Sequence, residues 1–231
     1  MNKSKIIFFF IVLIIFENCN SQTKNNEQYK NKRNIEFKEY LIAQKIPFKT
    51  LNDSVFSAYY MGFIYNKKRI DLESNPNLKV NKVYVHFITP SAVEFIIYSD
   101  EETFCISSYD VEINGKTLGF PDKGVIKVLE PIIVEYFGDY ELNNNIIKTK
   151  KRVLGPFSET YYHINGSIKN DTIYFTEKYE GKKYKFEKKF FSKKHKDNFI
   201  EVYQPNLNAR KYINNAGLTT FEVTGEFNVE K

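Results

Sequence analysis

The segment that decides the fold reads KVYVHFITPSAVEFIIYS, from Lys82 to Ser99. Both of its halves are rich in β-branched and aromatic residues whose side chains would alternate between two faces. Thr89-Pro90-Ser91, between the halves, has the residue types of a turn. The segment therefore predicts a β-hairpin with strands at Lys82–Thr89 and Val93–Ser99.

The same pattern continues along the chain. Turn signals such as Asn114-Gly115 and Asn170-Asp171 separate apolar runs at intervals of roughly 8–12 residues. Further strands are predicted at Phe104–Ser107, Val111–Leu118, Val125–Leu129, Ile132–Phe137, Tyr140–Leu142, Ile146–Val153, Thr160–Ile168, Thr172–Tyr179, Lys183–Phe191 and Phe199–Tyr203, with a last edge strand at Phe221–Val223. We therefore expect a mainly β fold, an antiparallel meander that forms a barrel or a strongly curled sheet.

Helix is expected only in short pieces. Phe37 and Leu41 lie four residues apart within Ile35–Ala43 and predict at most a short N-terminal helix. From about Val55 onward the pattern indicates strand, and Pro205–Ala216 predicts one helical turn. The absence of βαβ alternation and of a glycine-rich phosphate loop excludes the doubly wound nucleotide-binding folds.

The N-terminus has the pattern of an export signal. Lys3 and Lys5 precede Ile6–Phe16, an apolar run of 11 residues. As a helix this run would measure about 17 Å, too short for a hydrocarbon core of roughly 30 Å. It is therefore interpreted as the apolar part of a signal peptide.

Two cleavage sites are compatible with this signal. Phe16-Glu17-Asn18-Cys19 resembles the lipobox of bacterial lipoproteins, which implies a signal peptide over residues 1–18 and a lipid on Cys19. The alternative is ordinary cleavage after Ser21, with a signal peptide over residues 1–21. Residues 20–34 lack aliphatic side chains and predict a flexible tether to a single β-rich domain over residues 35–231. The expected location is the outer membrane through the lipid, or else the periplasm or the exterior.

The positive charge does not indicate a nucleic-acid partner. Of the 34 positively charged residues only four are Arg, at positions 33, 69, 152 and 210. Readers of nucleic acid depend on the arginine guanidinium for two-point contacts with bases and phosphates. The lysines between Lys178 and Lys196 alternate with aromatic residues, which is typical of a half-buried strand whose lysines face solvent.

The sequence offers few candidates for catalysis or metal binding. His86, His163 and His195 lack the spacing of a zinc site, Cys105 has the neighbours of a small buried hydrophobe, and Asp100-Glu101-Glu102 is typical of a solvated turn. An enzyme would need two or more of His86, His163, Cys105 and the neighbouring carboxylates to converge in a cleft. We therefore predict no catalytic residue, no metal, no cofactor and no enzymatic activity.

Three short segments carry a family resemblance. Gly138–Leu142, Asn145–Ile147 and Gly166–Ile173 resemble the repeated strand–turn–strand pattern of lipocalin-like lipoproteins of the bacterial envelope. The resemblance implies a small β-barrel attached to the membrane through a short linker. It also implies a small apolar or amphipathic ligand inside the barrel.

The alternative is a structural or interaction module without a ligand. The chain has 21 Phe and 17 Tyr, and a barrel of about eight strands can be filled by its own side chains. An internal pocket of about 300 Å³ or more would favour a binder, whereas a filled interior would favour the module. Protein partners are not predicted by any feature of the sequence.

Overall fold

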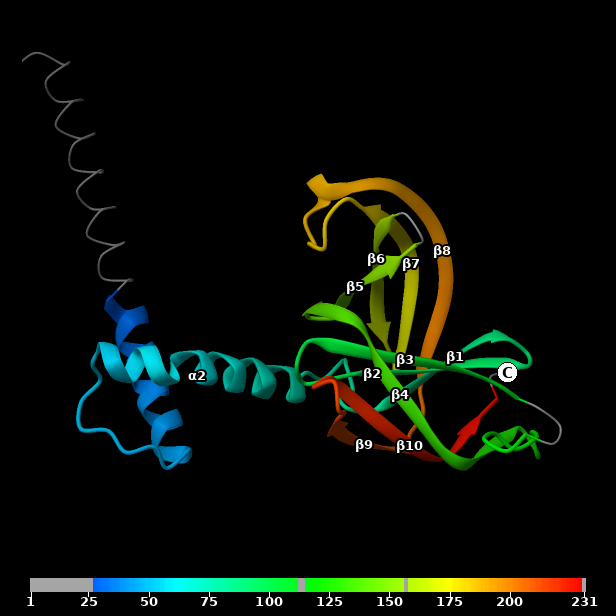
Figure 1. Ribbon diagram of the computed structural model, residues 1–231, viewed down its shortest axis with the longest axis horizontal. Helices are drawn as coiled ribbons and strands as arrows, with labels where there is room; N and C mark the ends of the chain where they lie inside the picture. Colours follow the sequence, from blue (N-terminus) through cyan, green and yellow to red (C-terminus); the bar gives the residue numbers. More distant parts are fainter. Residues whose placement is uncertain (1–26, 112–114, 156–157, 230–231) are drawn as a thin grey trace, which may run out of the picture. The chain divides into compact units, whose positions relative to one another are not determined.

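The structure is a computed structural model that describes residues 27–111, 115–155 and 158–229. Contacts divide the chain into two units, 1–67 and 68–231, and the boundary falls inside helix α2 (Asp53–Glu73) (Figure 1). The sequence instead predicts one domain over residues 35–231. The division follows from hydrophobic cores that do not merge, because the first unit has its own aromatic cluster.

The first unit contains a helix over residues 27–43 and the first part of α2. Phe37 contacts Phe56 and Phe63, with ring centroids 4.9 and 5.4 Å apart. The Asn52 side chain accepts a hydrogen bond of 3.0 Å from the Val55 amide and so caps the start of α2. No helix among the described residues combines the length and the apolar character needed to cross a bilayer.

Two predictions for this part of the chain are wrong. Residues 27–34 are helical where the sequence predicts a tether, and residues 53–73 are helical where it predicts strand. The cause in α2 is the spacing of Phe56, Tyr60 and Phe63. Side chains four and three residues apart share one face of a helix, and here that face covers Phe37.

The second unit contains ten antiparallel strands, and the prediction of a mainly β, curled antiparallel sheet is confirmed. They are β1 (Val83–Thr89), β2 (Ala92–Tyr98), β3 (Thr103–Asp110), β4 (Val125–Asn143), β5 (Ile146–Leu154), β6 (Glu159–Lys169), β7 (Thr172–Gly181), β8 (Phe191–Tyr203), β9 (Leu207–Ile213) and β10 (Thr219–Asn228). Their order is β3-β2-β1-β8-β7-β6-β5-β4-β10-β9, and a further β3–β4 pairing closes the first eight into a ring.

Strand β4 belongs to two parts of this sheet. Its last residues pair with β5, residues around Glu135 to Asp139 pair with β3, and Val125 to Glu135 pair with β10. The sequence predicts three separate strands here, but one strand of 19 residues runs through. Pro131 is tolerated because it lies where the pairing with β10 shifts register, between Val128 and Ile132.

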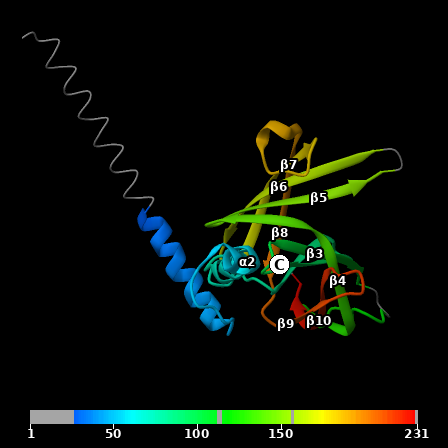
Figure 2. The same cartoon turned by 60° about the vertical axis from the view of Figure 1, so that its left-hand side comes forward.

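Strands β1 to β3 are buried on both faces over part of their length. Figures 1 and 2 show β5 to β8 on one side of them and β9 and β10 on the other. On β2, Val93, Phe95 and Ile97 belong to the core beneath β9 and β10, which we call the outer core. Ile96 and Tyr98 of the same strand belong to the core inside the ring. The alternation seen in the hairpin sequence thus serves two hydrophobic cores.

The turns of the ring follow from their sequence. Asn170 and Asp171, between β6 and β7, have φ angles of +49° and +61°. Two consecutive positive values match the tight hairpin turn that Asn and Asp favour. The Asn114-Gly115 signal cannot be compared in the same way, because residues 112–114 lie outside the described part of the chain. Leu118, at the end of that predicted strand, forms an isolated bridge with Val128.

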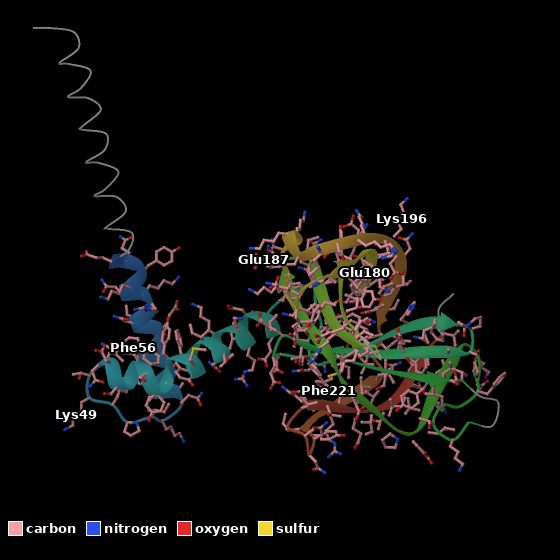
Figure 3. All side chains as sticks on the ribbon, turned by 45° about the horizontal axis from the view of Figure 1, so that its top comes forward. Lys49, Phe56, Glu180, Glu187, Lys196 and Phe221 are labelled. Atoms are coloured by element: carbon pink, nitrogen blue, oxygen red, sulfur yellow. The ribbon has the colours of Figure 1, made fainter. Side chains whose placement is uncertain are left out.

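Three C-terminal predictions are wrong. Lys183–Phe191, predicted as a strand, holds turns and a short 3-10 helix, η1 (Lys188–Phe190), between Glu180 of β7 and Lys196 of β8 (Figure 3). Pro205–Ala216, predicted as a helical turn, holds β9, because Leu207 and Ala209 contact the outer core. The strand around Phe221–Val223 is not an edge strand, since β10 lies between β4 and β9.

Candidate functional site

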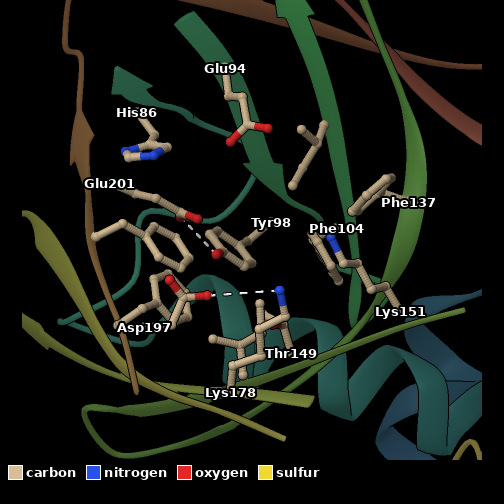
Figure 4. Close-up of a pocket in the computed structure, with 14 residues that line it drawn as sticks. His86, Glu94, Tyr98, Phe104, Phe137, Thr149, Lys151, Lys178, Asp197 and Glu201 are labelled. Atoms are coloured by element: carbon tan, nitrogen blue, oxygen red, sulfur yellow. Dashed lines mark hydrogen bonds and ion pairs between the residues drawn. The ribbon is translucent and has the colours of Figure 1, made fainter. Parts of the chain in front are cut away.

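The interior of the ring holds a pocket of about 160 Å³ (Figure 4). Every one of the eight ring strands contributes at least one lining residue. The lining consists of His86, Glu94, Tyr98, Phe104, Ile106, Phe137, Thr149, Lys151, Ile164, Phe175, Lys178, Asp197, Phe199 and Glu201. The pocket is therefore a product of ring closure and not of any single loop.

Strand alternation directs these side chains inward. Thr149 and Lys151 are two residues apart on β5, and successive side chains of a strand point to opposite faces. The same spacing relates Asp197, Phe199 and Glu201 on β8. Aromatic rings therefore alternate with charged groups around one small space.

Among the ionisable residues that line the pocket and that usually carry a charge, Glu201 is the most deeply buried, with 4% of its surface exposed. The Tyr98 hydroxyl donates a hydrogen bond of 2.8 Å to its carboxyl group. Burial raises the pKa of Glu201 to about 8, the hydrogen bond from Tyr98 lowers it, and the charge of Glu94 raises it. At neutral pH the carboxyl group is therefore mostly protonated and uncharged.

Glu94 and His86 form the neighbouring wall. They are directly paired across β1 and β2. His86 Nδ1 lies 2.9 Å from the carbonyl oxygen of Ile200, so Nδ1 carries the proton of that bond and Nε2 is left for other contacts. Glu94 receives one long hydrogen bond, 3.4 Å, from the Ser108 hydroxyl. No salt bridge to Glu94 occurs within the described ranges.

Lys178 and Lys151 lie on the opposite part of the ring, on β7 and β5. Lys178 pairs with Asp197 at 4.0 Å. The Lys151 ammonium lies 4.6 Å from the centroid of the Phe137 ring and has no salt bridge in the part of the chain that the structure describes. Burial and the nearby Lys178 lower the pKa of Lys151, while the carboxylates of Glu94 and Asp197 raise it.

The pocket adjoins a second cavity where β1 leaves β8. Those strands share two residue pairs, Tyr84↔Tyr203 and Val85↔Val202. Beyond them an open cleft lies between β1, β7 and β8, and four of its lining residues also line the pocket: His86, Phe175, Asp197 and Phe199. A small molecule in this cleft would thus already contact part of the pocket wall.

The structure places only one sequence candidate, His86, in the pocket. His163 is 1% exposed on the outside of the ring beneath Phe191, with ring centroids 4.6 Å apart, and burial lowers its pKa. Neither of its nitrogens bonds to any described residue. His195 pairs with Glu180 at 2.9 Å, outside the pocket lining.

Cys105 and the acidic turn also lie outside the pocket. Cys105 is buried in the outer core, and burial raises its pKa to about 12, so the thiol stays protonated. Asp100 and Glu101 both pair with Lys211, at 2.6 and 2.8 Å. Cys19, the predicted lipidation site, lies outside the described residues. Among the described residues no three His, Cys, Asp or Glu side chains form a metal-binding group.

Sequence reasoning missed the charged residues of the pocket. A signal was present in Glu94 and Glu201, which lie inside the apolar strand sequences VEFIIY and FIEVY. A carboxyl group that interrupts such a strand must face solvent, find a partner or lose its charge. Which of these applies depends on ring closure, and that is not visible in a single strand.

The chain was compared with protein families, curated proteins and solved structures. No family, no curated protein and no solved structure matches the chain.

Proposed function

We propose that the chain is an exported, lipid-anchored, β-barrel-like protein of the bacterial cell envelope that binds a small amphipathic molecule inside its ring. The observation that carries the binding proposal is the pocket lined from all eight strands. Eight strands are the size at which a barrel is either filled by side chains or holds one small ligand. Aromatic and charged groups together favour an amphipathic ligand over a purely apolar one.

The size of the pocket limits the ligand. Its volume, about 160 Å³, does not reach the roughly 300 Å³ given above as the size that favours a binder. It is close to the volume of an engineered cavity that holds benzene. We therefore propose a ligand of about six to nine non-hydrogen atoms. The alternative, an interaction module without a ligand, is favoured by the aromatic residues that fill the rest of the interior, and it is the outcome if nothing binds.

A neutral probe tests the binding proposal. We expect 3-methylbutanol to cause saturable shifts of the methyl NMR signals of Ile106 and Ile164, which line the pocket, and not of Ile132, which lies in the outer core. Ile164→Phe should weaken this binding about tenfold by filling the space, whereas Ile146→Phe on the exposed surface should leave it unchanged. Absence of any saturable shift would favour the module.

The anchor is tested separately in the host. We expect a fatty-acid analogue fed to the cells to label the natural chain and not Cys19→Ala, because Cys19 follows the apolar run at the spacing of a lipobox. Cys105→Ala is the matched control and should retain the label, since Cys105 is buried. An unlabelled natural chain that is still exported would instead establish ordinary cleavage after Ser21 and a periplasmic or secreted protein.

A further inference from the structure

Two charged side chains of the pocket, Glu94 and Lys151, have no ion-pair partner among the described residues, and the further inference is built on them. Glu94 and Lys151 belong to opposite parts of the ring, β2 and β5 (Figure 4). Neither forms a salt bridge within the described ranges, so more than 4.0 Å separates the ammonium nitrogen from the carboxylate oxygens. The carboxylate of Glu94 is still close enough to raise the pKa of Lys151.

The other ionisable side chains of the pocket already have partners. Asp197 neutralises Lys178 at 4.0 Å, and Glu201 shares its hydrogen bond with Tyr98. Glu94 and Lys151 are therefore one unmatched negative and one unmatched positive group facing the same small space. Both side chains are partly buried, and a charge that loses part of its hydration gains from a charged partner.

A ligand with a single charge would satisfy only one of these groups. An anion would pair with Lys151 and face Glu94, and a cation would do the reverse. A molecule that carries both charges would pair with both groups and leave the charge of the pocket unchanged. The rings of Phe104, Phe137 and Phe175 would contact its apolar body.

We propose that the ring pocket is a site for a small zwitterion, an amino carboxylate with an apolar body, whose ammonium group pairs with Glu94 and whose carboxylate pairs with Lys151. This inference rests on the proposed function, because it names the ligand class of the same pocket. Charge-assisted hydrogen bonds to both ends would fix the orientation of the ligand.

The test uses five probes of similar size and different charge. L-leucine and its isomer 6-aminohexanoate carry both charges at short and long separations. 4-Methylpentanoate carries only the negative charge, 3-methylbutylamine only the positive charge, and 3-methylbutanol neither. We expect at least one of the zwitterions to bind about tenfold more tightly than each of the three probes that lack one or both charges. The measurement is NMR titration of the Ile106 and Ile164 methyl groups at pH 7.

Two variants and their matched controls assign the contacts. Lys151→Met should abolish the advantage of the zwitterion over 3-methylbutylamine, and Glu94→Gln should abolish its advantage over 4-methylpentanoate. Lys148→Met and Glu141→Gln should change neither advantage, because these residues lie outside the pocket lining on β5 and β4. The methyl signal of Ile132 in the outer core shows whether each variant is folded.

The two proposals fail differently. If 3-methylbutanol or a singly charged probe binds as tightly as both zwitterions, the pocket is a ligand site and the zwitterion proposal is wrong. If the zwitterion is preferred but Lys151→Met and Glu94→Gln retain that preference, the assigned contacts are wrong. If no probe binds saturably, both the zwitterion proposal and the proposed binding function are wrong.

Discussion

Glu201→Gln should make the protein markedly more stable than the natural chain at neutral and alkaline pH, and much less so near pH 5. The native carboxyl group has a pKa of about 8 against 4.5 for the ordinary group. Between these values the folded state holds a proton that the unfolded state has released, so stability falls as pH rises. The loss is about 1.4 kcal/mol per pH unit.

The comparison of the two chains isolates this single group. From pH 5 to pH 7 the natural chain should lose roughly 3 kcal/mol of unfolding free energy relative to Glu201→Gln. The amide oxygen can still accept the Tyr98 hydrogen bond, so the variant changes little else. Urea unfolding at half-unit pH steps measures the difference, and Glu141→Gln on the outer surface serves as the control. A difference that does not vary with pH would show that Glu201 is ionised in the folded protein.

Gly138→Ala should prevent the ring from closing. Gly138 is paired with Phe104 on β3 and with Lys151 on β5. A Cβ atom at this position would lie 2.2 Å from the backbone carbonyl oxygen of Lys150 and 2.7 Å from the Phe104 ring. The backbone of Lys150 and the buried ring of Phe104 would both have to move, so we expect a loss of roughly 3 kcal/mol or more.

Gly119→Ala is the matched control for this prediction. Its nearest neighbour would be the Lys127 carbonyl oxygen at 3.4 Å, an ordinary contact distance. We expect a change of less than about 1 kcal/mol there. Urea unfolding gives both free energies, and the Ile164 methyl signal of the ring reports whether closure is lost. Equal stability of the two variants would contradict the role of Gly138 in the β3–β4 junction.

The sequence predicts the ring well where a local pattern decides the structure. The strands around Val83 to Tyr98 and from Ile146 to Tyr179 follow from alternation and from Asn and Asp in the turns. The pattern fails where aromatic residues fit two structures. Aromatic residues such as Phe56, Tyr60 and Phe63 are common in strands, but their spacing is that of one helix face. The packing of Phe56 and Phe63 on Phe37 stabilises the helix.

The candidate site was harder to predict than the fold. Glu94, Lys151 and Glu201 lie on three different strands, more than 100 residues apart at the extremes, and only ring closure brings them to one pocket. His86 was visible as a candidate, but its neighbours in the site were not. Long-range pairing such as β3 with β4 is not encoded in any short segment.

The hydrogen bond from His86 to Ile200 bears on how β1 and β8 stay together beside the open cleft. Backbone pairing between β1 and β8 ends at Val85, and the imidazole supplies the next link between them. Because a side chain and not the backbone makes this link, replacing His86 would remove it without changing either of the paired residues Tyr84 and Val85.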